Sequence, residues 1–353
     1  MTAMSPTPEE QVHFLRNIQR LLVEGQFTAS YKFALLHAIA DLCVLKGDDS
    51  GAALVLDVKD IAEKFIELYW QQCRPFQLGG QPTGIILQQN TGRQAAVIST
   101  VIKAQHDFGG SLFRLKQTAP DLWHSLKSDV KRVVNEMPLW KLQTVGCERM
   151  DFLYDNLDST TTTITLKPGI AFCFRAFYGL MRDLIQGAWV RFVQKVNVNN
   201  LGNVTDLGTF LFDQERSSLE AYKNVLIDVQ DRQCFYCHGN LQQSMDVDHF
   251  IPWSRYPTDL GHNFVLAHPR CNNAKSDHLA AEQHLQSWAE RNRGRSSELD
   301  ERLRDLGLPS DSSASLRITE WAYEQVEKSK GQVWLQQSLF QHLGPRWREL
   351  IVA

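Results

Sequence analysis

The sequence predicts a mainly α-helical fold with a minor β element and one compact module near residues 226–290. Three observations lead to this prediction. Apolar residues recur with a period near 3.6 over most of residues 8–75 and again over 170–197, as in helices that bury one face. β-branched residues gather at 158–169, which is typical of a strand. Cysteines and histidines cluster between residues 234 and 271.

Composition and charge set limits on the class of protein. The 353 residues have room for about two domains, and an apolar fraction of 43% supports packed cores. Because 37 basic residues face 40 acidic ones, any binding to nucleic acid needs a local basic face. The N-terminus lacks the pattern of a signal peptide, and the most apolar segment, FALLHAIADLCVL, is too short to span a membrane. We therefore expect a soluble, cytoplasmic protein without a membrane partner.

Residues 1–215 are expected to form a helical N-terminal domain. The segment SPTPEEQVHFLRNIQRLLVEG begins with prolines and an acidic first turn, and it places Phe14, Ile18 and Leu21 on one face. The same period predicts helices in YKFALLHAIADLCVL, VKDIAEKFIELYWQQC, RQAAVISTVIKAQHDFG, SDVKRVVNEMPLWKLQ and IAFCFRAFYGLMRDLIQGAWVRFVQKVN. The last of these is apolar over much of its surface, so we expect it to lie at the centre of the domain.

The rest of the chain is expected to hold the compact module, at 216–290, and a helical C-terminal segment, at 291–353. The stretch NNLGNVTDLG (199–208) is the best candidate for a linker. The segment FLFDQERSSLEAYKNVLIDVQ then predicts a helix that leads into the module. The segments RNRGRSSELDERLRDLG and PSDSSASLRITEWAYEQVEK predict the C-terminal helices.

The seven cysteines fall into two groups. Cys43, Cys73, Cys147 and Cys173 are scattered, and we expect them to be buried free thiols. Three others lie in two short pairs of ligands, CFYC (Cys234 and Cys237) and HPRC (His268 and Cys271).

Each pair has two intervening residues, a spacing that lets one turn direct two ligands at one ion. Three thiolates and one imidazole favour tetrahedral zinc, which would hold a small core together. His238 is an alternative fourth ligand, but the spacing of His268 from Cys271 mirrors that of the first pair. The sequence therefore predicts a structural zinc site.

The residues between and after the two pairs carry a resemblance to a known family. The chain shows DHFIP, then NFVL, then CNNAK. This closely resembles the HNH endonucleases, in which an acidic residue precedes a histidine, a proline follows three residues later, and a central asparagine precedes Cys-Asn-x-x-Lys. The paired metal ligands match the four-ligand members of that family. The resemblance covers about 50 of the 353 residues, and several spaced matches make it specific.

The resemblance implies a ββα-metal fold, a bent hairpin packed on a helix, held by the zinc ion. It implies that His249 is the general base and that Asp248 and Asn272 hold a catalytic Mg²⁺ or Mn²⁺ ion. Asn263 corresponds to the central asparagine, which braces the loop and orients the base. Lys275 is expected to contact a phosphate.

The chemistry of these residue types fits phosphodiester hydrolysis. A neutral imidazole can accept a proton from the attacking water at pH 7. Carboxylate and carboxamide oxygens suit a hard divalent cation and leave coordination positions for substrate. Arg255 and Arg270 are further candidates for phosphate contacts.

Other polar residues near this motif have two interpretations. Asp246 is either a second acidic ligand or a solvated residue, and Trp253 either packs under the loop or stacks on substrate. His262 and His278 are expected at the surface. Residues 231–295 carry seven basic and seven acidic residues, the arginines of the run RNRGR included. That run either contributes part of a basic field or forms a solvated linker.

Two functions follow as hypotheses. The first is a metal-dependent DNA endonuclease or nickase, and the second is a zinc-stapled module that binds nucleic acid or protein without cutting. The segments YKFALLHAIADLCV, IAEKFIELYWQQ and LIQGAWVRFV resemble helical extensions of HNH proteins in bacterial anti-phage defence loci, such as the Zorya type. This resemblance implies a role in defence or restriction. DNA and other subunits of a defence system are the expected partners.

Overall fold

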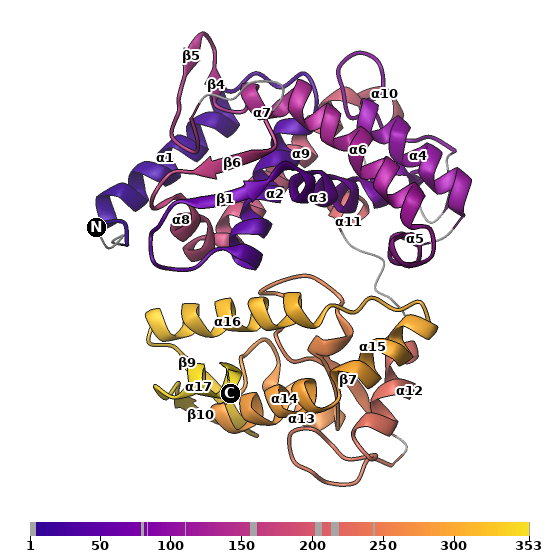
Figure 1. Ribbon diagram of the computed structural model, residues 1–353, viewed down its shortest axis with the longest axis vertical. Helices are drawn as coiled ribbons and strands as arrows, with labels where there is room; N and C mark the ends of the chain where they lie inside the picture. The colour runs from indigo at the N-terminus through magenta and orange to yellow at the C-terminus, as the bar shows by residue number, and fades with distance from the viewer. Residues whose placement is uncertain are drawn as a thin grey trace. The chain divides into compact units, whose positions relative to one another are not determined.

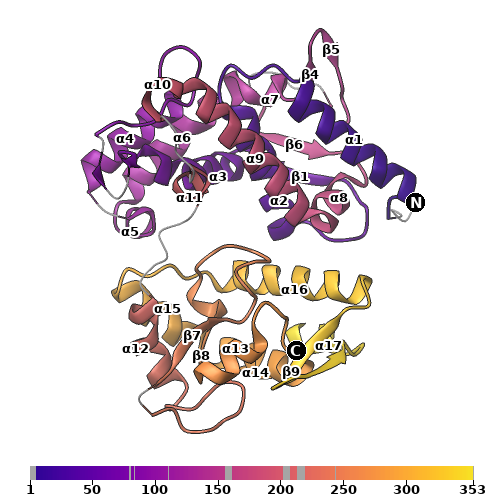
Figure 2. The same ribbon diagram turned by 180° about the vertical axis from the view of Figure 1, so that it is seen from behind.

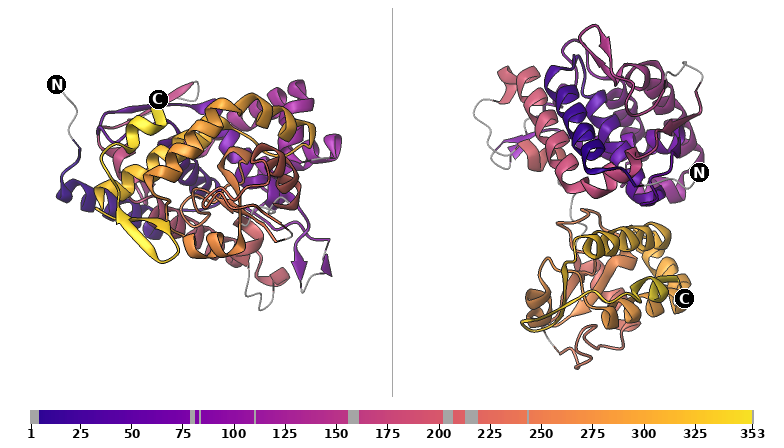
Figure 3. Two further views of the ribbon diagram at one scale, coloured as in Figure 1. Left: turned by 90° about the horizontal axis from the view of Figure 1, so that it is seen from below. Right: turned by 90° about the vertical axis from the view of Figure 1, so that its left-hand side faces the viewer.

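The computed structural model describes residues 5–78, 81–82, 84–109, 111–155, 161–201, 207–212, 219–242 and 244–352. The chain divides into two compact units, residues 1–214 and 215–353. Figures 1, 2 and 3 show the units, coloured from indigo to magenta and from orange to yellow. The prediction of a mainly α-helical chain with a minor β element is confirmed, and the strands form small antiparallel sheets.

The N-terminal unit is built around helix α2 (Tyr31–Lys46). Every residue from Tyr31 to Val44 is buried, as expected for a helix that is apolar on all sides. Around it pack α3 (Val58–Trp70), α8 (Ile170–Ala176) and α9 (Tyr178–Val196). The 170–197 segment was expected to be one central helix. It does pack on α2, but the expectation of a single helix is wrong, because the segment divides at Phe177 into α8 and α9.

The remaining N-terminal elements surround this core. They are α1 (Pro8–Glu24), η1 (Gln71–Cys73), α4 (Ala96–Phe108), α5 (Leu112–Thr118), α6 (Pro120–Glu136), α7 (Pro138–Lys141), α10 (Val198–Leu201) and α11 (Leu207–Phe212). Three two-stranded antiparallel sheets join β1 (Leu54–Asp57) with β6 (Thr163–Leu166), β2 (Gln77–Leu78) with β3 (Gln81–Pro82), and β4 (Thr144–Val145) with β5 (Glu148–Arg149).

The predicted strand and linker are only partly described. Strand β6 lies within the predicted tract 158–169. The first three residues of that tract, 158–160, lie outside the described residues. The predicted linker, 199–208, begins in α10 and ends in α11, and its middle, 202–206, also lies outside the described residues. Cys43, Cys73 and Cys173 are buried free thiols as predicted, whereas Cys147 is exposed.

A buried arginine fixes the C-terminal end of α2. Arg175 Nε lies 2.6 Å from Asp49 Oδ1, and both side chains are almost fully buried. Its Nη1 donates to the carbonyl oxygens of Val44 and Gly47, at 3.1 and 2.9 Å. The last carbonyls of a helix have no partner within the helix, so Arg175 stabilises α2 and ties it to α8.

The C-terminal unit contains a short hairpin followed by a helix, with further helices around it. Strand β7 (Asp246–His249) pairs antiparallel with β8 (Phe264–Ala267), so that Asp246 faces Ala267 and His249 faces Phe264. Helix α13 (Pro269–Lys275) begins two residues after β8. The other elements are α12 (Leu219–Val229), η2 (Gly261–Asn263), α14 (Glu282–Gly294), α15 (Ser296–Asp305), α16 (Ser312–Lys328), β9 (Gln332–Gln336), β10 (Leu339–His342) and α17 (Trp347–Val352).

The hairpin and the C-terminal elements share one aromatic core. Phe250, just after β7, stacks on Trp288 of α14 with ring centroids 5.3 Å apart. Tyr236 packs edge-on against Trp334 of β9 at 5.1 Å. Residues 291–353 therefore belong to the same compact unit as the hairpin. The division into functional parts at 1–215, 216–290 and 291–353 stays a prediction.

Among the described residues, no helix combines the length and the apolar character needed to cross a bilayer.

We expect Arg175→Ala to destabilise the N-terminal unit strongly. Removing one partner of a buried ion pair leaves the Asp49 carboxylate buried without its charge partner, which costs about 3–5 kcal/mol. Urea unfolding of the full chain measures the change. Arg132→Ala is the matched control, because its pair with Asp129 is exposed and contributes about 0–1 kcal/mol. Equal losses in both variants would contradict the assigned role of Arg175.

Candidate functional site

Four residues of the C-terminal unit form a metal-binding group. The ligand atoms of Cys234, Cys237, His268 and Cys271 all lie within 4.8 Å of one another. Cys234 and Cys237 stand on a tight turn in which the His238 amide donates to the Cys234 carbonyl oxygen at 2.9 Å. His268 immediately precedes α13, and Cys271 lies in its first turn. The chain thus brings the two predicted pairs together.

His268 is oriented for metal binding through one ring nitrogen. Its Nε2 lies 3.2 Å from the carbonyl oxygen of Asn240, which can only accept, so Nε2 carries the hydrogen. Nδ1 is then the ligand atom, and it lies 3.3 Å from Cys237 Sγ. Such outer hydrogen bonds are typical of histidines that bind metals. The alternative ligand, His238, is exposed and lies outside the group.

The electrostatics of the three thiols favour a bound cation. Burial raises the pKa of Cys237, but hydrogen bonds from the Gly239 amide and the neighbouring ligands outweigh burial and lower that pKa to about 7. Burial and the nearby Cys234 and Cys237 raise the pKa of Cys271 to about 12. Ionisation of Cys271 therefore requires a compensating positive charge nearby. Soft thiolates with one imidazole are the donor set of structural zinc.

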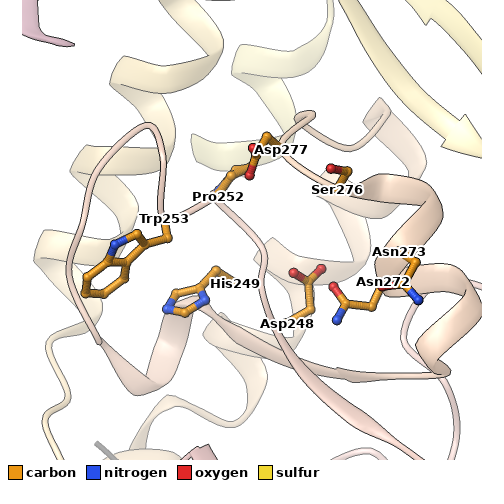
Figure 4. A pocket seen from close by; sticks show the side chains of 8 residues that line it. All are labelled: Asp248, His249, Pro252, Trp253, Asn272, Asn273, Ser276 and Asp277. Atoms are coloured by element: carbon orange, nitrogen blue, oxygen red, sulfur yellow. The ribbon is translucent and has the colours of Figure 1, made fainter. Parts of the chain in front are cut away.

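The C-terminal unit also contains a polar pocket of about 230 Å³ (Figure 4). Strand β7 contributes Asp248 and His249, and α13 contributes Asn272. Figure 4 shows the three side chains in a row, with His249 next to Asp248 and Asn272 beyond it. The full lining is Asp248, His249, Pro252, Trp253, Asn272, Asn273, Ser276 and Asp277. The structure thus brings the three predicted residues into one pocket.

Asp248 is held from behind by two buried side chains. The hydroxyl of Tyr236 donates to Oδ2 at 2.5 Å. Burial and the Asp248 carboxylate raise the pKa of Tyr236 well above its ordinary value, so this hydroxyl stays a donor. Lys275 Nζ lies 3.0 Å from the same oxygen. Asp248 is only 8% exposed, and its carboxylate oxygens lie at the wall of the pocket.

Lys275 does not lie where the sequence analysis expected it. Its side chain is completely buried and also donates to the carbonyl oxygen of His249 at 2.9 Å. The side chain turns inward from α13 because the buried Asp248 carboxylate needs a positive partner. In this geometry Lys275 positions Asp248 and β7 and does not reach a phosphate in the pocket.

Asn272 is oriented by Asp246, a residue of β7, the strand that also carries Asp248 and His249. Its Nδ2 donates to Asp246 Oδ2 at 3.1 Å, which leaves the carboxamide oxygen as its acceptor group. Asp246 is half-buried, and it does not line the pocket. Asp246 therefore acts on the pocket through Asn272.

The His249 ring is held on several sides. Nε2 lies 2.8 Å from Asp259 Oδ1, and Asp259 is buried. The ring also packs edge-on against Trp253 and Phe264, with centroids 5.4 and 4.7 Å apart. The sequence analysis did not single out Asp259. The only sequence feature that could have pointed to Asp259 is that it is an acidic residue in the loop between His249 and Asn263.

Asn263 braces the loop that follows β7. Its Oδ1 accepts from the Ile251 amide at 2.8 Å, and its Nδ2 donates to the Ile251 carbonyl at 3.0 Å. Its own carbonyl accepts from the Phe250 amide at 2.8 Å. Asn263 therefore braces the loop, as expected. It was also expected to orient His249, but the carboxylate that contacts the His249 ring belongs to Asp259.

The two arginines predicted to bind phosphate differ in exposure. Arg270 is exposed on α13. Arg255 is half-buried, and burial lowers its pKa, while the nearby Tyr323 and Asp277 act in the opposite direction. Contact of either arginine with phosphate stays a prediction.

Most of the RNRGR run is structural. Arg291 is half-buried and donates to the carbonyl oxygens of Phe264 and His262, at 2.6 and 2.7 Å. Arg295 bonds Glu298 and the Val229 carbonyl. The expectation that His262 lies at the surface is wrong, because it is fully buried.

We expect Cys271→Ser to lower the zinc content of the purified full-length chain well below the about one ion per chain that a complete site holds. Because the ion joins the 234–237 turn to α13, the melting temperature of the C-terminal unit should also fall. Elemental analysis and thermal unfolding measure the two effects. Cys147→Ser, at an exposed cysteine, is the control. Full zinc content in Cys271→Ser would contradict the assignment.

Comparison with known proteins assigns the two parts of the chain to different family models. Residues 234–278 match the model HNH endonuclease, and this segment contains the metal-binding group and the pocket residues. Searches of curated proteins and of solved structures found no match. Residues 11–211, more than half of the chain, match the model Domain of unknown function (DUF8808). The chain therefore belongs to the DUF8808 family and carries an HNH segment after that domain.

Proposed function

We propose that this chain is a metal-dependent DNA endonuclease or nickase. The observation that carries the proposal is the convergence of Asp248, His249 and Asn272 on one pocket. The pocket lies within the segment that matches the HNH endonuclease model. A module that only binds a partner would need the metal-binding group, but it has no need of this second set of residues.

His249 acts as the general base in the proposed reaction. The imidazole takes a proton from a water molecule, and the water oxygen attacks the phosphorus of the scissile phosphodiester. The bond between phosphorus and the 3′ oxygen breaks, and its electron pair leaves with that oxygen, which takes a proton from solvent. The products are a 5′-phosphate and a 3′-hydroxyl. His249 then releases its proton to solvent.

The oxygen donors in the pocket fit a hard divalent cation. Asp248 offers a carboxylate, and Asn272 offers the carboxamide oxygen that its bond to Asp246 leaves available. When bound, Mg²⁺ or Mn²⁺ supplies charge stabilisation to the phosphate and to the leaving oxygen. The ammonium of Lys275 already offsets the charge of Asp248. The protein residues alone therefore bind the cation weakly, and substrate phosphate completes the site.

Arg270 and Arg255 supply positive charge for the DNA backbone in this proposal. Arg270 is exposed on the helix that carries Asn272, and Arg255 lies in the loop that follows His249. The chain has a net charge of −3, so binding must depend on such local contacts.

We further propose that the chain works in bacterial anti-phage defence or restriction, with other subunits of a defence system as partners. The resemblance of the N-terminal helices to defence-associated HNH proteins supports this role. The N-terminal unit would then restrain the nuclease until infection.

We expect His249→Ala to lower the rate of plasmid cleavage by about 10²–10⁴-fold in Mg²⁺ or Mn²⁺, the usual contribution of a general base. Supercoiled plasmid separates nicking from double-strand cutting, and EDTA should abolish both. His278→Ala is the matched control, because this histidine is exposed and does not line the pocket.

Two outcomes would contradict the nuclease proposal. One is equal cleavage by wild type and His249→Ala. The other is a zinc-loaded wild-type chain that binds DNA without cutting it in any divalent metal, which would favour the non-catalytic binding module.

Restraint by the N-terminal unit makes a separate prediction. A fragment of residues 215–353, which corresponds to the second compact unit, should cleave plasmid faster than the full chain. Circular dichroism and zinc content establish that the fragment is folded before its rate is compared. A folded fragment with equal or lower activity would count against restraint and would leave the nuclease proposal unchanged.

A further inference from the structure

Asp259 contacts the proposed base in a way that neither the motif nor the family match assigns. We propose that Asp259 is a positioning residue, which fixes the orientation and tautomer of His249 so that Nδ1 receives the proton from water. The inference rests on the proposed nuclease function. It moves the orienting role from Asn263, where the sequence resemblance put it, to a carboxylate in the preceding loop.

The geometry of the pair leaves His249 little freedom. Asp259 Oδ1 lies 2.8 Å from Nε2, and the side chains of His249 and Asp259 are 14% and 4% exposed. Trp253 and Phe264 pack edge-on against the same ring. A flipped ring would lose the bond to Asp259, so one orientation is favoured.

The chemistry of the two groups determines the tautomer. A carboxylate can only accept, so the hydrogen of neutral His249 must lie on Nε2. Nδ1 is then the acceptor, on a residue that lines the pocket. When Nδ1 takes a proton from water, the Asp259 carboxylate stabilises the imidazolium that forms. The same logic operates where an aspartate holds a catalytic histidine in hydrolases.

The surroundings of Asp259 do not explain the residue as a stabilising one. Its second oxygen, Oδ2, is buried and has no hydrogen-bond partner among the described residues. Burying a carboxylate with one hydrogen-bond partner is unfavourable for folding. An aspartate that is kept at such a position, aimed at the proposed base, fits a role in the reaction.

The loop that carries Asp259 is fixed by contacts that do not involve its side chain. The amide of Gly261 donates to the Pro309 carbonyl at 2.9 Å. A Cβ at Gly261 would come within 2.2 Å of Leu303 Cδ1, so the loop lies directly against α15. Asn263 holds the start of the loop through Ile251. Replacing Asp259 should therefore leave the backbone in place and change mainly the His249 ring.

The first test reads the tautomer directly, without cleavage. Nuclear magnetic resonance of the full-length, zinc-loaded chain with ¹⁵N-labelled histidine, without Mg²⁺ or Mn²⁺, identifies the protonated ring nitrogen. His249→Ala assigns the signal by its loss. We expect neutral His249 to carry its hydrogen on Nε2 in wild type and to become a mixture of tautomers in Asp259→Ala. A wild-type ring protonated on Nδ1 would overturn the proposal.

The second test separates positioning from folding by kinetics. Asp259→Ala should lower kcat about 100-fold with little change in KM, because the base contributes to the chemical step. Asp259→Asn keeps an oxygen that accepts from Nε2 and should recover part of that loss. Asp300→Asn is the matched control, since Asp300 lies 3.8 Å from His262 outside the pocket.

The outcomes distinguish the two proposals. A kcat for Asp259→Ala within about twofold of wild type would overturn the role of Asp259. A loss in Asp259→Ala that comes with lost zinc or a lower melting temperature, and no recovery in Asp259→Asn, would also overturn it. A wild-type chain that cleaves no DNA overturns the nuclease proposal, and the resonance experiment still decides whether Asp259 fixes His249.

Discussion

The pocket depends on one constraint, the placement of α13 against β7. Two elements this short cannot bury enough apolar surface to hold each other. The cysteine and histidine group joins the 234–237 turn to the start of α13, and Cys271 directly precedes Asn272. A metal ion bound by Cys271 therefore sets the position of Asn272, which lines the pocket. Loss of that ion would displace Asn272 from Asp248 before it altered the chemistry of either.

A second set of contacts connects the pocket to the C-terminal elements. Tyr236 stands between the two cysteines of the first pair, donates to Asp248, and packs against Trp334 of β9. Gly261 lies against α15, and so fixes the loop that carries Asp259. The C-terminal elements thus form part of the scaffold that positions both Asp248 and His249.

The sequence predicted those parts of the site that depend on local spacing. The two ligand pairs and the Asp248-His249 dipeptide are close along the chain, so their pattern is visible before folding. Asp259 and the inward turn of Lys275 depend on tertiary contacts, and no spacing rule reveals them. The same difference between local pattern and tertiary contact explains which elements of the fold were predicted. Long amphipathic helices were predicted, but β1 and the β9–β10 hairpin were not, because short strands acquire their partners only through distant parts of the chain.

The charges around the pocket explain how an acidic chain can approach a polyanion. Four carboxylates lie in or beside the pocket, and each has a positive or hydrogen-bonding partner. Asp246 accepts a hydrogen bond from Asn272. Lys275 pairs with Asp248, His249 bonds Asp259, and Arg255 lies close enough to Asp277 for their charges to interact. Unpaired, these carboxylates would repel phosphate before a divalent cation arrived. Because these carboxylates are paired, the pocket offers oxygen ligands while its net repulsion of a phosphate is small. Cation and phosphate can then enter together.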